Sequence, residues 1–325
     1  MNFQISILLI SFIVSIVCGI IVIPILKSLK VGQIERDDGP QSHLKKQGTP
    51  TMGGIIMILV MIIMSIFLFF KYRTSDIGLI NNMLPLVFVA IGFGLVGFVD
   101  DFKKLILKNT KGLKPMYKML GLLIISVVYT LYLVKFSNIG TETYIPIIKT
   151  YINIPVWLYI PFAIFVLLGT TNAVNLTDGI DGLSTSVTTI ILACLVSISI
   201  IMGVGEITLF GTILIGACLG FLLFNLHPAK VFMGDTGSLL LGGAISGIAL
   251  YLKMPLILIV IALIPIIETL SVMIQVAYFR KTGKRIFKMA PIHHHFELSG
   301  WKEGKVVSVF SIITLILCII GISII

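Results

Sequence analysis

Charged residues are scarce in this chain, and their scarcity excludes an ordinary soluble domain. Asp, Glu, Lys and Arg make up 12% of the 325 residues, whereas 57% are hydrophobic. A typical soluble protein has roughly a quarter of its residues charged. The mean hydropathy of +1.10 points the same way. The composition therefore predicts a protein embedded in a membrane.

Cysteine is also scarce, and its positions exclude a disulfide framework. The four cysteines, Cys18, Cys194, Cys218 and Cys318, all lie inside long apolar runs. They have no metal-ligand spacing, so they indicate neither a metal site nor a redox compartment.

Long apolar runs, in contrast, are abundant. A membrane-spanning helix needs about 20 predominantly apolar residues. Ten runs approach or exceed that length, at about 3–26, 52–70, 80–99, 116–135, 155–173, 184–203, 206–224, 237–252, 255–279 and 305–325. We predict an all-α polytopic protein with ten transmembrane helices in one integral membrane domain, 1–325. The first run has no basic flank or cleavage site of a signal peptide. Alternation within 136–154 suggests a small hairpin.

The basic residues are sorted by loop rather than spread over a nucleic-acid-binding surface. Nineteen of the 24 Lys and Arg residues fall in the alternate regions 27–51, 100–118, 226–236 and 280–305. The positive-inside rule places these regions in the cytoplasm. Ten spans then leave both termini outside.

Four polar clusters interrupt the apolar sequence, at 99–104, 172–183, 232–238 and 290–297. All four fall on the predicted cytoplasmic side, although the charge count did not presuppose it. A chain that only spans a bilayer does not need them. They predict a catalytic face at one membrane surface.

The first cluster places two acids and two bases at the end of the third span. Lys103 and Lys104 follow Asp100 at helical offsets of three and four, so acid and base share a face. Asp100 and Asp101 form a hard-oxygen pair suited to Mg²⁺ or to proton abstraction. The alternative is a charged helix end that anchors the span.

The second cluster ends the fifth span. Asn172, Asn175 and Asp178 step by threes and therefore line one helix face. Gly179 and Gly182 should break the helix and expose Asp181. The alternative is a polar helix terminus with a glycine stop.

The third cluster precedes the eighth span. We expect Thr236 or Ser238 to cap that helix and its free N–H groups to suit a phosphate. Asn225, at the end of the previous span, can point back to this cluster. Asp235 is the best candidate for a metal ligand, because a diphosphate substrate normally arrives with Mg²⁺. Plain helix capping is the alternative.

Two glycine patterns resemble functional motifs but indicate helix packing. Gly92, Gly94 and Gly97 match a dinucleotide-binding fingerprint inside a span, without the strand–helix unit that the fingerprint needs. Gly216 and Gly220 have the spacing of a helix-contact motif.

Span nine contains a proline and an acid. Pro265 removes a helical hydrogen bond and should bend the helix there. The bend would open an apolar groove towards the Asp100 and Asp235 site. Glu268 lies at membrane depth, where an ionisable group is a functional candidate. The alternative is that Glu268 only stabilises packing.

With these motifs the chain resembles the bacterial phospho-N-acetylmuramoyl-pentapeptide-transferases, within the polyprenyl-phosphate N-acetylhexosamine-1-phosphate transferase superfamily. The resemblance covers essentially the whole chain. The motifs that carry it are Gly48 to Gly54, Val99 to Asp101, Asn172 to Leu183, Phe232 to Ser238 and Pro291 to Glu297.

The resemblance implies a reaction. Undecaprenyl phosphate attacks the β-phosphorus of UDP-MurNAc-pentapeptide and yields undecaprenyl-diphospho-MurNAc-pentapeptide (lipid I) and UMP, with Mg²⁺ as the cofactor. It also implies a homodimer in the inner (plasma) membrane of a bacterium, surrounded by membrane lipids, active in cell-wall synthesis and without a nucleic-acid partner.

The resemblance further implies roles for individual residues. Asp235 would bind Mg²⁺, and Asp100 would be the base, with Asp101 as the third catalytic acid. The expected substrate-binding residues are Lys46, Lys104 and Lys118 at phosphate oxygens, Thr51 and Asn172, the nucleoside pocket of Asn175, Asp178, Asp181, Phe232 and Gly234, the orienting Asn225, and His293, His294 and His295 at the sugar or phosphates.

Two other functions stay open. The sister enzymes that transfer GlcNAc-1-phosphate share the aspartates, and only the histidine segment and its surroundings argue against them. A lipid or ion transporter would also have many spans. However, transporters place polar groups near the midplane and often contain inverted repeats, neither of which the sequence shows.

Overall fold

Helices dominate the structure. The computed structural model describes residues 3–29, 48–107 and 112–325. The long helices are α1 (Phe3–Ser28), α3 (Gly54–Tyr72), α4 (Ile77–Leu107), α5 (Pro115–Lys135), α6 (Val156–Thr177), α7 (Leu183–Ile201), α8 (Gly205–Asn225), α9 (Gly234–Tyr251), α11 (Leu263–Thr282) and α13 (Glu303–Ser323). Among the described residues, nine helices are long and apolar enough to cross a membrane. The prediction of an all-α polytopic membrane protein is confirmed.

Helix α9 is the long helix whose sequence is not apolar enough for that criterion. Its side chains from Thr236 to Leu250 are nevertheless all buried. Glycine and serine lower its hydropathy, but they allow close packing against α4 and α6 at the centre of the bundle. A helix that contacts protein on every side needs small side chains more than apolar ones.

Glycines at two helix contacts bring backbones together, as the sequence predicts. A Cβ on Gly216 would lie 2.6 Å from the carbonyl oxygen of Leu8 in α1, and one on Gly220 would lie 2.5 Å from the Cβ of Ser15. The Gly92–Gly97 pattern also lies in a helix, α4, and faces α5 and α9. Both motifs therefore serve helix packing.

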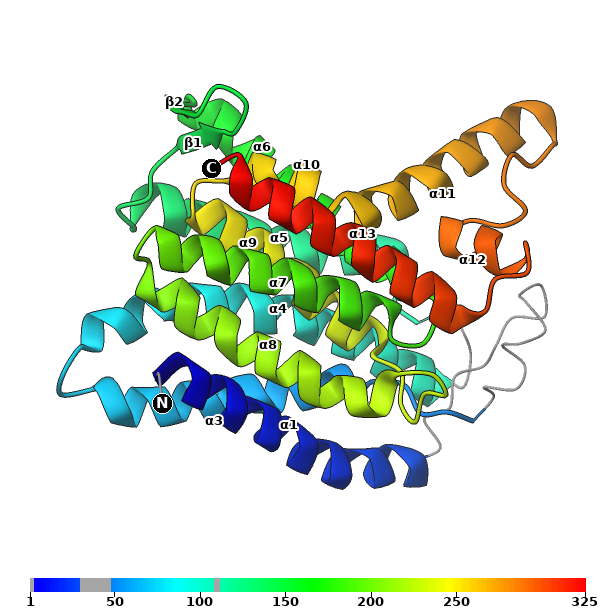
Figure 1. Ribbon diagram of the computed structural model, residues 1–325, viewed down its shortest axis with the longest axis horizontal. Coiled ribbons are helices and arrows are strands. Elements are labelled where there is room, and N and C mark those ends of the chain that lie inside the picture. The colour runs from blue at the N-terminus through cyan, green and yellow to red at the C-terminus, as the bar shows by residue number, and fades with distance from the viewer. Residues whose placement is uncertain (1–2, 30–47, 108–111) are drawn as a thin grey trace.

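The ninth span is broken into three pieces. They are the 3₁₀ turn η1 (Pro255–Ile257), the short α10 (Leu258–Ile261) and α11, which leaves the bundle (Figure 1). The break occurs at Ala262 (φ −105°, ψ 24°), not at Pro265 as predicted. A proline ring clashes with the carbonyl four residues earlier, here that of Ile261, so the helix ends before the proline.

The end of the bundle that carries the termini also carries the predicted hairpin. Strands β1 (Glu142–Ile145) and β2 (Thr150–Asn153) are antiparallel, with Glu142 opposite Asn153. The Lys253 ammonium lies 2.6 Å from a Glu142 carboxylate oxygen, and the Tyr144 hydroxyl donates to the carbonyl of Ile325. Both termini lie at this end, and α12 (Ile292–Glu297) lies at the other (Figure 1).

We expect this geometry to place Lys284 in the cytoplasm and Ile147 outside. Both side chains are exposed, and all four native cysteines are buried, so engineered thiols should dominate labelling. In intact cells, a membrane-impermeant maleimide should label the Ile147→Cys variant. It should label Lys284→Cys only after permeabilisation. The reverse pattern would invert the orientation.

Candidate active site

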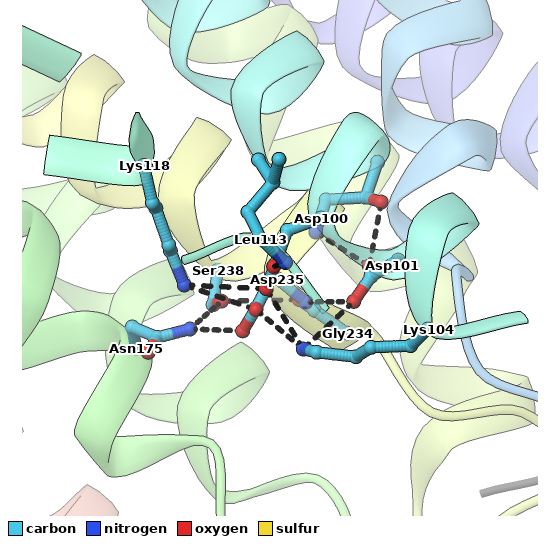
Figure 2. A network of polar contacts seen from close by, with 10 residues as sticks. Asp100, Asp101, Lys104, Leu113, Lys118, Asn175, Gly234, Asp235 and Ser238 are labelled. Atoms are coloured by element: carbon cyan, nitrogen blue, oxygen red, sulfur yellow. Dashed lines mark hydrogen bonds and ion pairs between the residues drawn. The ribbon is translucent and has the colours of Figure 1, made fainter. Parts of the chain in front are cut away.

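Asp235, in the first turn of α9, is the centre of a polar network (Figure 2). One carboxylate oxygen accepts from the Lys104 ammonium at 2.8 Å and from the Lys118 ammonium at 3.0 Å. The other accepts from the Asn175 amide at 2.7 Å. The same amide nitrogen lies 2.8 Å from the Ser238 hydroxyl. Helices α4, α5, α6 and α9 thus each contribute a side chain to one point.

Asp101 caps α9 from a neighbouring helix. One of its oxygens accepts from the backbone N–H and the hydroxyl of Thr236, at 2.9 and 2.7 Å, and the other lies 3.3 Å from the backbone nitrogen of Asp235. The prediction that Thr236 or Ser238 caps this helix is wrong, because α9 begins earlier, at Gly234. Two of the first N–H groups, expected to be free for a phosphate, are already bound.

Asp100 lies beside Asp101 but contacts different groups. One oxygen accepts the backbone N–H of Leu113 at 2.6 Å. The other lies 2.9 Å from the Lys104 ammonium and 3.7 Å from that of Lys118. The predicted pairing of Asp100 with Lys104 on one helix face is present. Three carboxylates against two ammonium groups give this cluster one formal negative charge in excess.

Backbone pairing fixes the segment before α3 against the segment before α9. Phe232 donates its N–H to the carbonyl of Pro50, and its own carbonyl accepts the N–H of Gly53 at 2.8 Å. Gly54 donates to the carbonyl of Met233. Met52 has a left-handed φ of 70°, which L side chains adopt rarely. Residues Pro50 to Gly54 of the motif therefore anchor the segment just before Asp235, and Phe232 stays half-buried.

Glycine permits the contact between α4 and α9 at this point. A side chain on Gly97 would overlap the backbone carbonyl of Asp235, and one on Gly54 would overlap the backbone of Gly237. Gly234 has φ +71°, and a Cβ there would lie 2.6 Å from an Asp101 oxygen and 2.8 Å from the Thr51 hydroxyl. The sequence predicts only general helix packing for Gly97, whereas in the structure this glycine directly sets the position of Asp235.

Asp181, in the turn between α6 and α7, is not exposed as predicted. It is 3% exposed, and one oxygen accepts from the backbone N–H of Ala229 and contacts His227 Nδ1, both at 3.0 Å. Gly182 at φ +75° turns the chain into α7, but the acid points into the protein because the 226–233 loop supplies donors. Sequence reasoning missed His227; its place between Asn225 and Phe232 was the available signal.

Asn225 and Asn172 bind protein groups rather than the Asp235 cluster. The Asn225 amide donates to the carbonyl of Val231 at 3.0 Å and accepts from the Thr185 hydroxyl at 2.8 Å. It therefore positions the loop before Phe232. Asn172 donates to the carbonyl of Leu168 in its own helix.

The three histidines of α12 have different surroundings. His293 is fully buried, and His294 is 8% exposed with Nδ1 2.7 Å from a Glu297 oxygen. His295 is half-buried, and its Nδ1 accepts the backbone N–H of Lys288. They cannot all contact one ligand. Thr51 is half-buried near Gly234, and Lys46 lies outside the described residues.

The acidic cluster fits a hard divalent cation. One oxygen from each of Asp100, Asp101 and Asp235 lies within 4.8 Å of the others. Carboxylate oxygens are the ligands that Mg²⁺ prefers. Asp101 binds the backbone of α9, whereas Asp235 and Asp100 contact lysine ammonium groups that a cation could replace.

The fold and site together define a class, a polytopic helical membrane protein with a cluster of acids and lysines at one end of its bundle. Residues 83–253, which include Asp100, Asp101 and Asp235, match the model of glycosyl transferase family 4. The chain belongs to the phospho-N-acetylmuramoyl-pentapeptide-transferase family.

Relatives of that name support this assignment along nearly the whole chain. One from Clostridium perfringens strain 13 is 53% identical over 97% of this chain and 96% of its own. One from Acetivibrio thermocellus is 48% identical over 98% and 94%. One from Caldicellulosiruptor bescii is 46% identical over 98% and 96%.

Gly97→Ala should destabilise the protein by about 1–3 kcal/mol, the usual cost of overpacking, because its methyl group would collide with backbone that cannot rotate away. Gly92→Ala is the matched control on the same helix. Its Cβ would meet only the flexible side chain of Ile125 at 3.2 Å. Unfolding temperatures in detergent should fall for Gly97→Ala and stay near wild type for Gly92→Ala. Equal temperatures for the two variants would contradict the proposed contact.

Asp178 should make stability depend on pH. It caps the C-terminus of α6, where loss of solvation and then the charges of Asp235, Asp101 and Asp181 raise its pKa to about 8. The unfolded chain releases this proton near pH 4, so Asp178 lowers stability progressively between about pH 4 and pH 8. The unfolding temperature of Asp178→Asn should therefore exceed that of wild type by more at pH 8 than at pH 5. A constant difference would show an ordinary pKa.

Proposed function

We propose that this protein transfers phospho-MurNAc-pentapeptide from UDP-MurNAc-pentapeptide to undecaprenyl phosphate, releasing UMP and forming lipid I. The observation that carries the proposal is Asp235, held by two lysines and an amide at the end of a membrane bundle. Family membership gives the reaction class. A membrane-embedded acceptor and a soluble anionic donor require a site at a membrane surface, and a polar cluster at one end of the helical bundle suits that position.

The cluster suits phosphoryl transfer, which depends mainly on positioning and charge neutralisation. Asp235, with Asp100 beside it, would hold Mg²⁺, which would supply positive charge to the donor's diphosphate. Lys104 and Lys118 then have ammonium groups available for phosphate oxygens. The acceptor phosphate oxygen attacks the β-phosphorus, the bond from that phosphorus to the bridging oxygen breaks, and UMP leaves with the electron pair. Asp100 accepts any proton that remains on the acceptor phosphate.

The acceptor's hydrocarbon chain needs an apolar surface that leads to this cluster. Helix α11 leaves the bundle after the break at Ala262, and its buried residues lie only in its first half. Beyond them Met273 and Ile274 are exposed. We place the polyprenyl chain along this helix. The basic cytoplasmic loops would attract the anionic donor.

Purified protein in detergent with undecaprenyl phosphate and Mg²⁺ should release UMP from UDP-MurNAc-pentapeptide at least about a hundredfold faster than from UDP-GlcNAc, since a donor that leaves specific contacts unmade loses several kcal/mol. The readout is UMP, measured chromatographically.

Asp235→Asn is the inactive control, and Asp100→Asn should bind donor normally while losing turnover. Preference for UDP-GlcNAc would assign the chain to the sister activity. Release of UMP without any lipid product would contradict transfer. An Asp235→Asn protein with a normal rate and Mg²⁺ dependence would place the metal elsewhere.

A further inference from the structure

A buried acid–histidine pair joins α11 to α12, away from the Asp235 cluster. The side chains of Glu268 and His293 are both 0% exposed, and Nδ1 of the ring lies 3.1 Å from Oε2 of the acid. That contact is off the line of a straight hydrogen bond. The backbone nitrogen of His293 lies 3.4 Å from the same oxygen, and Oε1 has no partner among the described residues. Both polar contacts of this carboxylate thus come from one residue.

Stability alone does not explain this arrangement. Removing a carboxylate from water costs several kcal/mol, and one partner rarely compensates it. An apolar pair of similar size would pack there at lower cost. The acid instead fixes the orientation of α12, because it contacts both the backbone nitrogen and the ring of His293, the second residue of that helix.

The other edge of the His293 ring faces the end of α6. Any side chain on Gly179 would overlap Nε2 of this ring. Gly179 lies between Asp178 and Asp181. On the α12 side, the His293 ring is 4.1 Å from the His294 ring, measured between centroids. The His293 imidazole is therefore packed between α11, the 178–182 turn and His294.

We propose that Glu268 and His293 are a positioning pair, which aligns His294 and the 178–182 turn against the fixed first half of α11. His293 then contacts no substrate, contrary to the role that the resemblance implies for it. This inference rests on the proposed function, because it assigns the pair to the donor side of that site. Disturbing the pair should raise the KM for the nucleotide donor and leave the KM for undecaprenyl phosphate nearly unchanged.

Two amide substitutions separate positioning from ligand contact. The amide nitrogen of Asn lies where His Nδ1 lies, and that of Gln reaches the place of Nε2. His293→Asn should therefore keep the contact with Glu268 and a donor KM within about threefold of wild type, whereas His293→Gln and His293→Ala should raise it about tenfold. Gly179→Ala should resemble His293→Ala. Ser271→Ala is the matched control, because the Ser271 hydroxyl donates to the backbone carbonyl of Glu268 within α11.

A double-mutant cycle tests the coupling without relying on the reaction. Glu268→Ala and His293→Ala should each lower the unfolding temperature, and the double variant should be no worse than the more damaging single one. The donor KM should follow the same non-additive pattern.

Three results would overturn the pair. They are a donor KM closer to wild type in His293→Gln than in His293→Asn, additive losses of unfolding temperature in the double variant, and an equal rise in the KM values of both substrates. If wild-type protein releases no UMP from UDP-MurNAc-pentapeptide, the proposed function fails. The unfolding-temperature cycle then decides the pair by itself, and additive losses overturn it.

Discussion

The capping of α9 by Asp101 is the interaction on which the active site depends. Helix α9 is buried from Thr236 to Leu250, so water cannot satisfy the Thr236 N–H, and a buried unpaired donor is costly. Asp101 supplies the acceptor from α4. Its neighbour Asp100 is thereby brought to the Lys104 and Lys118 ammonium groups that bind Asp235. Asp101, which caps α9, and Asp100, which contacts the lysines of the site, are therefore adjacent residues of α4.

Close backbone approach makes this cap possible. Gly97 and Gly54 lack the side chains that would separate α4 and α3 from the start of α9. Backbone hydrogen bonds between 50–54 and 232–233 then fix the loop before Asp235. The carboxylates are brought together by packing, and Lys104 and Lys118 offset most of their repulsion. A divalent cation would have to compete with these lysines for Asp235, which couples metal binding to the release of two ammonium groups.

A similar device recurs at α12. Glu268 in α11 accepts from the backbone nitrogen of His293 near the start of a short helix, as Asp101 does for α9. In both cases a buried carboxylate from one helix orients the beginning of another. The start of a helix carries unpaired N–H donors. An acid on a neighbouring helix that accepts from them can therefore fix the orientation of the second helix as well as its distance from the first. Burial inside the protein favours this solution, because water is then not available as an alternative partner.

The sequence by itself determined the membrane class, the positions of most spans, the hairpin and the residues of the central cluster, because hydropathy and helical spacing act locally. It also determined that the Gly92–Gly97 pattern serves packing. Helix α4, however, continues to Leu107, beyond the predicted end of its span at 99. The tertiary structure alone decided which polar group binds which. Asp181 turns inward to Ala229, Asn225 binds a loop carbonyl, and the ninth span breaks at Ala262 rather than Pro265. These outcomes depend on donors and acceptors distant in sequence, and no local pattern records where those partners lie.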